Sequence, residues 1–230
     1  MHDRPKRFEA ALTLVGGGPF DRASLAEAQA LAPVLVAADQ AADRLADMGE
    51  TPALVVGDMD SIADLEAWRR RRVPVLHLPE QDTTDFEKCL YATDAPFYLA
   101  VGFTGGRIDH SLAVLHAMLR RPEKRVLLIG DREIAFFVPP DRSIGFRVAQ
   151  GSTVSLFPLA ETTGTLSEGL RWSVRGLTLA PGHQIGTSNQ ALAGDIAVAF
   201  DRPGALMTLD RRALTSAIAT LTGAVSSGAR

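Results

Sequence analysis

The chain has 230 residues, 46% of them hydrophobic and 22% charged, a composition that excludes a disordered protein and allows one large or two smaller domains. Its formal net charge of −3 argues against a general nucleic-acid binder, whose affinity comes mainly from phosphate neutralisation. No apolar stretch approaches the roughly 20 residues of a membrane span, and the amino terminus is charged, so we expect a cytoplasmic protein without a membrane partner.

The first 140 residues alternate short apolar runs with segments of helical period. Runs that are apolar throughout are typical of parallel strands covered on both faces, and they occur at residues 10–15, 33–38, 53–57, 73–78, 97–102 and 125–130. Helices are expected between them at residues 24–32, 41–48, 62–71, 84–92 and 109–121. Cys89, the only cysteine, lies on the apolar face of the fourth helix and is expected in the core. The alternation predicts an α/β domain with a mostly parallel sheet over residues 1–140.

The pattern changes at Pro139 and Pro140, which we interpret as a domain boundary. Short apolar runs separated by glycine, proline and polar turns follow at residues 145–150, 152–159, 169–174, 176–180, 195–201 and 205–210. Such runs are typical of an antiparallel β-sandwich, so we expect an all-β domain over residues 141–230. Trp172 lies in the third run and is expected in the sandwich core.

Three polar clusters follow apolar runs in the first domain: "VVGDMDS", "HLPEQDTTDFEK" and "AVGFTGGRIDH". In an open α/β sheet the ends of these runs share the carboxyl edge, where ligands bind. Asp58 and Asp60 are two residues apart, so in extended backbone they point to the same side, about 6.6 Å apart along the chain. A site with few protein carboxylates leaves coordination positions on the metal ion open, an arrangement that suits Mg²⁺ carrying a polyphosphate. The guanidinium of Arg107 suits phosphate oxygens.

Each cluster also has a purely structural interpretation. Thr84 with Glu87 forms a capping box, and Asp85 suits the first turn of a helix. Asp109 is a possible N-cap of the next helix. The glycine segment "VGGGPFD" at residues 15–21 is compatible with a simple turn, and neither common glycine-rich phosphate motif occurs.

Taken in order, "AADQAADR", "GDMDSI", "QDTTDFEKCL", "GFTGGRIDHSLAVL", "GLRWSV" and "GTSNQA" resemble the thiamine pyrophosphokinase family across nearly the whole chain. The resemblance implies an α/β catalytic domain, a β-sandwich domain for thiamine binding and dimerisation, and a homodimer with shared active sites. It also implies Mg²⁺-dependent transfer of diphosphate from ATP to the hydroxyethyl group of thiamine, leaving AMP.

The resemblance assigns roles residue by residue. Asp58, Asp60 and Asp85 are the expected magnesium ligands, and with Arg107 they form the expected catalytic set. The expected ATP-side residues are Gln81, Asp82, Thr84, Lys88, Arg107 and Asp109, and the expected thiamine-side residues are Asp39, Ser188 and Asn189.

The chain departs from the family pattern at Gln40, Ala41 and Asp43, where two glycines and an asparagine are common, and at Gln190, where glutamate is frequent. Two alternatives stay open. "DMDSI" partly matches the D-x-D-x-[TV] motif of a haloacid-dehalogenase-like phosphatase, with Ile62 at the fifth position. The scaffold is also compatible with a non-catalytic nucleotide-binding or thiamine-binding module.

Overall fold

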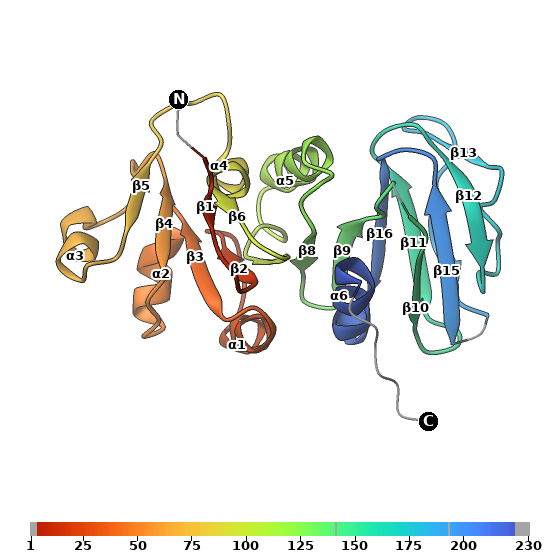
Figure 1. Cartoon of the computed structure of the whole chain (residues 1–230), viewed down its shortest axis with the longest axis horizontal. Coiled ribbons are helices and arrows are strands. Elements are labelled where there is room, and N and C mark those ends of the chain that lie inside the picture. Colours follow the sequence, from red (N-terminus) through yellow and green to blue (C-terminus); the bar gives the residue numbers. More distant parts are fainter. Residues whose placement is uncertain (1–3, 141, 193, 224–230) are drawn as a thin grey trace. The chain divides into compact units, whose positions relative to one another are not determined.

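The computed structural model describes residues 4–140, 142–192 and 194–223. The chain forms two compact units, Met1–Gly130 and Asp131–Arg230 (Figure 1). The second unit begins before the expected boundary at residue 141 because the strand Glu133–Phe137 pairs with Ala205–Asp210. A strand stays with the sheet that satisfies its backbone hydrogen bonds.

The sheet of the first unit is parallel throughout, and its strand order is β8-β7-β2-β3-β4-β5. The strands are β2 (Leu12–Val15), β3 (Val34–Ala38), β4 (Leu54–Gly57), β5 (Val75–His77), β7 (Tyr98–Val101) and β8 (Val126–Ile129). Every residue of β2, β4, β7 and β8 is buried, which explains their continuous apolar character. All six expected strands are confirmed.

The five expected helices of this unit are also confirmed. They are α1 (Arg22–Leu31), α2 (Ala41–Asp47), α3 (Leu65–Arg70), α4 (Asp85–Ala92) and α5 (Ile108–Arg120). Along the chain they alternate with the strands of the sheet (Figure 1). Side chains cap three of the amino termini: Asp21 caps α1, Asp64 caps α3 and Thr84 caps α4. Cys89 is fully buried, as expected. A short parallel pair, β1 (Lys6–Arg7) with β6 (Thr93–Asp94), completes the unit.

The second unit contains two antiparallel sheets. One has the order β14-β11-β16-β9, with β9 (Glu133–Phe137), β11 (Thr153–Pro158), β14 (Gly186–Gln190) and β16 (Ala205–Asp210). The other has the order β10-β15-β12-β13, with β10 (Ile144–Arg147), β12 (Thr162–Glu168), β13 (Thr178–Leu179) and β15 (Asp195–Phe200). Phe136 of β9 and Phe146 of β10 pack edge to face, 6.4 Å between ring centroids, so side chains of the two sheets meet in one core.

Several elements of this unit differ from the expectation. Residues 169–174 do not form a strand but a loop touched by an isolated bridge from Leu170 to Ala191. Trp172 in this loop is 56% exposed, so its expected place in the core was wrong. The strands β9, β12 and β14 were not anticipated, and β14 carries the "GTSNQ" segment.

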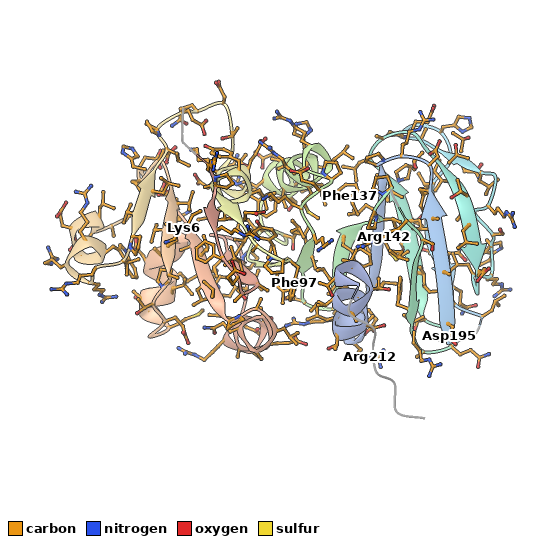
Figure 2. All side chains as sticks on the ribbon, viewed as in Figure 1. Lys6, Phe97, Phe137, Arg142, Asp195 and Arg212 are labelled. Atoms are coloured by element: carbon orange, nitrogen blue, oxygen red, sulfur yellow. The ribbon has the colours of Figure 1, made fainter. Side chains whose placement is uncertain are left out.

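Helix α6 (Leu214–Thr222) was also not anticipated. It follows a 3₁₀ turn, Arg211–Ala213, and its side chains bond to β10: Ser216 accepts from the Arg147 amide at 3.3 Å, and Thr220 donates to the Gly145 carbonyl. Arg142, labelled in Figure 2, donates to the carbonyl of Leu221 in the last turn of α6. Tertiary contacts therefore stabilise a segment whose local sequence, rich in threonine, is a weak helix former.

Candidate active site

Three carboxylates gather where β3 and β4 end. Asp39 follows β3, and Asp58 and Asp60 follow β4, its parallel neighbour. One carboxylate oxygen from each lies within 4.8 Å of the other two. Gly57 permits this approach, because a Cβ at that position would lie 2.8 Å from the Cβ of Asp39. Asp39 and Met59 adopt left-handed backbone conformations, with φ of 45° and 63°, a strain of the kind that is often found at functional sites.

A buried carboxylate oxygen of Asp39 bears on whether this cluster fits a cation. Asp39 is 3% exposed, and within the described structure its Oδ1 has no hydrogen-bond partner. Burial raises the pKa of this carboxyl, and the charges of Asp58 and Asp60 raise it further. A donor set made only of carboxylate oxygens matches a hard divalent cation such as Mg²⁺. The cluster fits the expected metal, with Asp39 added to it.

Lys88 on α4 lies against the same cluster from the side of the helix. Its Nζ is 3.3 Å from Asp58 Oδ2 and 3.5 Å from Asp85 Oδ1, and its side chain is 2% exposed. Burial alone lowers the pKa of this ammonium, but the charges of Asp85 and Asp58 outweigh burial and the net shift is upward. Lys88 is therefore a buried cation held between two carboxylates.

The pKa values of Asp58 and Asp85 are shifted in opposite directions, although both carboxylates contact Lys88. Burial raises the pKa of Asp58, but hydrogen bonds from Gln81 and the Asp60 amide, together with the charge of Lys88, bring it below its ordinary value. Burial raises the pKa of Asp85 to about 6, because Lys88 opposes this effect only in part and Asp39 and Asp58 add to it. At neutral pH Asp58 is firmly ionised, and Asp85 titrates just below neutrality.

The loop between β5 and α4 supplies further expected residues. Gln81 donates from Nε2 to Asp58 Oδ2 at 2.8 Å, so it lies in the cluster. Asp82 is exposed, and no interaction brings its side chain to the carboxylates within the described residues. Thr84 accepts from the Glu87 amide at 3.3 Å and so caps α4. The carboxylate of Glu87 pairs instead with Arg120 at 3.0 Å, so only half of the expected capping box forms.

Arg107 and Asp109 pair with each other and not with the carboxylate cluster. Arg107 donates from Nε to Asp109 Oδ1 at 3.1 Å and from its second nitrogen to Oδ2 at 2.5 Å. The side chains are 71% and 63% exposed, which leaves the guanidinium open to solvent. The N-cap of α5 is Arg107, so the alternative role of Asp109 as N-cap was wrong.

The glycine segment after β2 is joined to the loop after β7 through its backbone. Gly16 donates to the carbonyl of Val101 at 2.9 Å, and Gly18 donates to that of Gly102 at 2.7 Å. Arg44 of α2 donates to the carbonyl of Gly18 and stacks over the ring of Phe20, 3.9 Å from its centroid. The segment is thus a fixed part of the same sheet edge.

In the second unit, the side-chain amide of Asn189 is buried, and both its nitrogen and its oxygen bond to backbone groups. Its Nδ2 donates to the Trp172 carbonyl at 2.6 Å, and its Oδ1 accepts from the amides of Trp172 and Gln190 at 3.1 and 2.8 Å. Asn189 therefore holds the loop that exposes the Trp172 indole, over which Arg171 lies 4.9 Å from the ring centroid. Ser188 is exposed, with a left-handed φ of 59°.

Three of the family departures, Gln40, Asp43 and Gln190, make specific contacts. Gln190 accepts from Arg171 at 3.2 Å and donates to the Gly151 carbonyl at 3.2 Å. Asp43 accepts from the Ala63 amide at 2.8 Å and from the Trp68 indole nitrogen at 3.3 Å, and so ties α2 to the segment that follows Asp60. Gln40 lies over Gly17, where an added Cβ would be 3.0 Å from its Nε2. Sequence reasoning did not place Asp39 with the metal cluster, although its position directly after an apolar strand next to β4 is the signal that would have found it.

Family descriptions match both units. Residues 25–128 match "Thiamin pyrophosphokinase, catalytic domain", and residues 141–204 match "Thiamin pyrophosphokinase, vitamin B1 binding domain". Thiamine pyrophosphokinase 2 of Arabidopsis thaliana is 30% identical over 156 residues, and thiamine pyrophosphokinase 1 of Oryza sativa subsp. japonica is 29% identical over 154. Each alignment covers 60% of this chain, and the chain spans 58% of the length of each relative.

Solved structures share the fold at low sequence identity. Yeast thiamin pyrophosphokinase aligns over 97% of this chain and 95% of its own, with a TM-score of 0.75 and 16% identity. Thiamin pyrophosphokinase from Geobacillus thermodenitrificans aligns over 87% and 96%, with a TM-score of 0.68 and 21% identity. The expected combination of a mostly parallel sheet and an antiparallel sandwich is therefore also the fold of these enzymes.

Proposed function

Since the chain belongs to the thiamine pyrophosphokinase family, we propose that it transfers diphosphate from ATP to the hydroxyethyl group of thiamine, giving thiamine diphosphate and AMP. The observation that carries the proposal is the cluster of Asp39, Asp58 and Asp60 at one strand edge, with a buried carboxylate oxygen that has no partner among the described residues. Three carboxylates this close together repel one another, and Lys88 offsets only part of their negative charge. The arrangement is therefore costly unless a ligand neutralises the rest.

Asp58 and Asp60, with Asp39, would hold Mg²⁺, and Asp85 borders the same site through Lys88. This moves Asp39 from the expected thiamine side to the metal. Bound Mg²⁺ supplies neutralisation of the charge on the diphosphate being transferred.

The chain's own residues position the reactants and screen their charge. Gln81 and Lys88 fix the orientation of Asp58, because both donate to its Oδ2. Arg107 presents two donors in a fixed fork to solvent, and it binds phosphate oxygens in exchange for Asp109. Transfer of phosphoryl groups depends mainly on positioning and electrostatics, so this arrangement needs no strong protein base.

The thiamine side of the proposal rests on the second unit. The Trp172 indole is exposed and offers a flat apolar surface, and the buried Asn189 holds its backbone in place. Ser188 offers a hydroxyl on β14 for a hydrogen bond to the substrate. We propose a homodimer in which these groups complete the catalytic site of the partner subunit.

The two alternatives have less support. A phosphatase of the haloacid-dehalogenase type needs Asp58 free to attack phosphorus, whereas its Oδ2 accepts from both Gln81 and Lys88. A non-catalytic module has no need for a dense carboxylate cluster. No described helix has the length and apolar character to cross a bilayer, and a cytoplasmic location remains part of the proposal.

The proposal is tested by incubating the protein with ATP, Mg²⁺ and thiamine and separating the products. Thiamine diphosphate with AMP is the expected outcome. Thiamine monophosphate with ADP would contradict diphosphate transfer, and ATP binding without turnover would favour the non-catalytic module. A covalent phosphate on Asp58 would favour the phosphatase.

The shared site is tested by mixing subunits. One partner carries Asp58→Asn and the other carries Ser188→Ala with Trp172→Ala, so that each homodimer lacks one half of the site. A heterodimer with shared sites regains one intact site, so activity returns in part. If the subunits exchange fully and no activity returns, the site lies within one chain.

A further inference from the structure

Glu80 organises the loop between β5 and α4 around its carboxylate. Its Oε2 accepts from the amides of Asp82 and Thr83 at 3.1 and 3.2 Å. Its Oε1 accepts from the Thr83 hydroxyl at 2.7 Å and from the Tyr91 hydroxyl at 2.5 Å. Burial raises the pKa of Glu80, but the hydrogen bonds from Tyr91 and Thr83 outweigh burial and hold it below its ordinary value. We call these four residues the Glu80 network.

The Glu80 network fixes the position of Gln81 from both sides. Tyr91 is on α4, so its hydroxyl fastens Glu80 to a helix that also carries Lys88. Bonds from the amides of Asp82 and Thr83 to Glu80 close a tight turn around Gln81, which donates to Asp58 at 2.8 Å. No side chain of the network contacts Asp58 directly in the described structure. Its effect on the carboxylate cluster therefore passes through the loop backbone and Gln81, and through the charge of Glu80 acting on Lys88.

We propose that Glu80 and Tyr91 are positioning residues, which preform the loop that holds Asp58 in the orientation required for Mg²⁺–ATP. The inference rests on the proposed function for its kinetic consequence, whereas the loop order itself is measurable without activity. A charge-assisted network of this kind restricts the loop before the ligand arrives and lowers the entropic cost of binding.

Two variants weaken the network to different degrees. Tyr91→Phe keeps the ring and removes one donor to Glu80. Glu80→Gln keeps the shape of the side chain but removes its charge and one of its two acceptor oxygens, so the hydrogen bonds that remain are no longer assisted by charge. The matched control is Tyr98→Phe, which removes the chain's other tyrosine hydroxyl and its bond to the Thr93 carbonyl at 3.0 Å, away from the loop.

The first readout is amide hydrogen exchange at Asp82 and Thr83 in the ligand-free protein. We expect exchange to be about tenfold faster in both network variants and unchanged in Tyr98→Phe, since Tyr91→Phe releases the carboxylate that accepts from these amides and Glu80→Gln removes its charge. Unchanged exchange in Tyr91→Phe and Glu80→Gln would overturn the inference, whether or not the protein transfers diphosphate.

The second readout is the dependence of the rate on Mg²⁺. In Glu80→Gln we expect about tenfold more Mg²⁺ for half-maximal activity, less of a shift in Tyr91→Phe, and recovery of kcat at saturating Mg²⁺. A merely structural role would lower kcat at every Mg²⁺ concentration without changing the Mg²⁺ needed for half-maximal activity, and that result would overturn the inference. If Glu80→Gln does not fold, Tyr91→Phe alone decides by both readouts.

Discussion

The strand ends of the first unit and the β14 region of the second use buried polar groups in opposite ways. In the first unit Asp39, Asp58 and Lys88 concentrate charge, and one Asp39 oxygen has no partner among the described residues. In the second, Asn189 is neutral, and both its amide nitrogen and its amide oxygen bond to backbone groups. The first arrangement suits the proposed cation, whereas the second bonds within the protein and serves to expose an aromatic ring. Substitutions in the two regions should therefore fail differently.

The largest expected effect is the loss of activity in Asp58→Asn or Asp60→Asn. Each variant removes a carboxylate from the proposed metal site, which is worth several kcal/mol of transition-state stabilisation, or roughly 10² to 10⁴ in kcat/KM. The fold should persist, because asparagine keeps the side-chain shape. Steady-state kinetics and thermal melting measure both quantities.

The control for these variants is Asp195→Asn, which makes the same chemical change in an exposed pair with Arg147. Exposed pairs contribute little, so this variant should keep its activity and its stability. Near-normal turnover in both Asp58→Asn and Asp60→Asn would contradict the proposed metal site in the first unit.

Asn189→Ala should act first on stability. The substitution leaves the backbone amide and carbonyl of Trp172 without their partners, at a cost of about 1–3 kcal/mol in the free energy of unfolding. Thiamine affinity should fall with it, because the Trp172 loop loses its anchor. Denaturant unfolding and thiamine titration measure these effects.

Ser188→Ala is the comparison, since this exposed neighbour should change stability by less than about 0.5 kcal/mol. Equal stability of the Asn189→Ala and Ser188→Ala proteins would mean that the amide of Asn189 does not hold the loop.

Arg107→Lys should raise the KM for ATP by about fivefold to tenfold with little change in thiamine binding. Lysine keeps the charge but loses the planar fork of donors. The contact with phosphate therefore loses roughly one charge-assisted hydrogen bond. Arg147→Lys is the matched control, because Arg147 also forms an exposed two-nitrogen pair with an aspartate. If the two variants behave alike, Arg107 has no special part in ATP binding.

A pH dependence of stability is expected from Asp85. Its pKa, raised by burial from 3.8 to about 6, means that the folded protein binds this proton more tightly than the unfolded chain. In the metal-free protein, the contribution of Asp85 to the free energy of unfolding is therefore largest below pH 3.8 and falls as the pH rises to about 6. Tm curves should show Asp85→Asn gaining stability relative to the unsubstituted protein across that range. A constant difference between the two would contradict the raised pKa.

The elements that sequence reasoning found are those with a strong local signal. Continuous apolar runs such as β4 and β8 are visible without any structure, because both faces of a central parallel strand are buried. Helix α6 and strand β12 were missed, because "LTSAIATLT" and "TTGTLSE" carry weak local preferences and form through contacts with β10 and β15.

The site divides in the same way. Asp58 and Asp60 were found because they follow an apolar strand in a short polar motif, the family resemblance added Gln81 and Lys88, and the structure brings the four together. Asp82 and the Arg107–Asp109 pair do not contact that cluster within the described residues, and Glu80 and Tyr91 gave no signal of their own. The bond between these two residues depends on how a loop folds back onto a helix, which spacing in the sequence does not encode.

By itself the sequence determined the α/β alternation, the motif order that marks the family, and the placement of acidic residues after strands. Those features are local, since burial of each run and the chemistry of each motif depend on near neighbours in the chain. Only the tertiary structure decided that Asp39 joins Asp58 and Asp60, that Lys88 is buried between two carboxylates, and that Asn189 holds Trp172 at the surface. Each of these depends on the alignment of neighbouring strands, or on how a loop or helix packs beside them, and so on distances that no single segment contains.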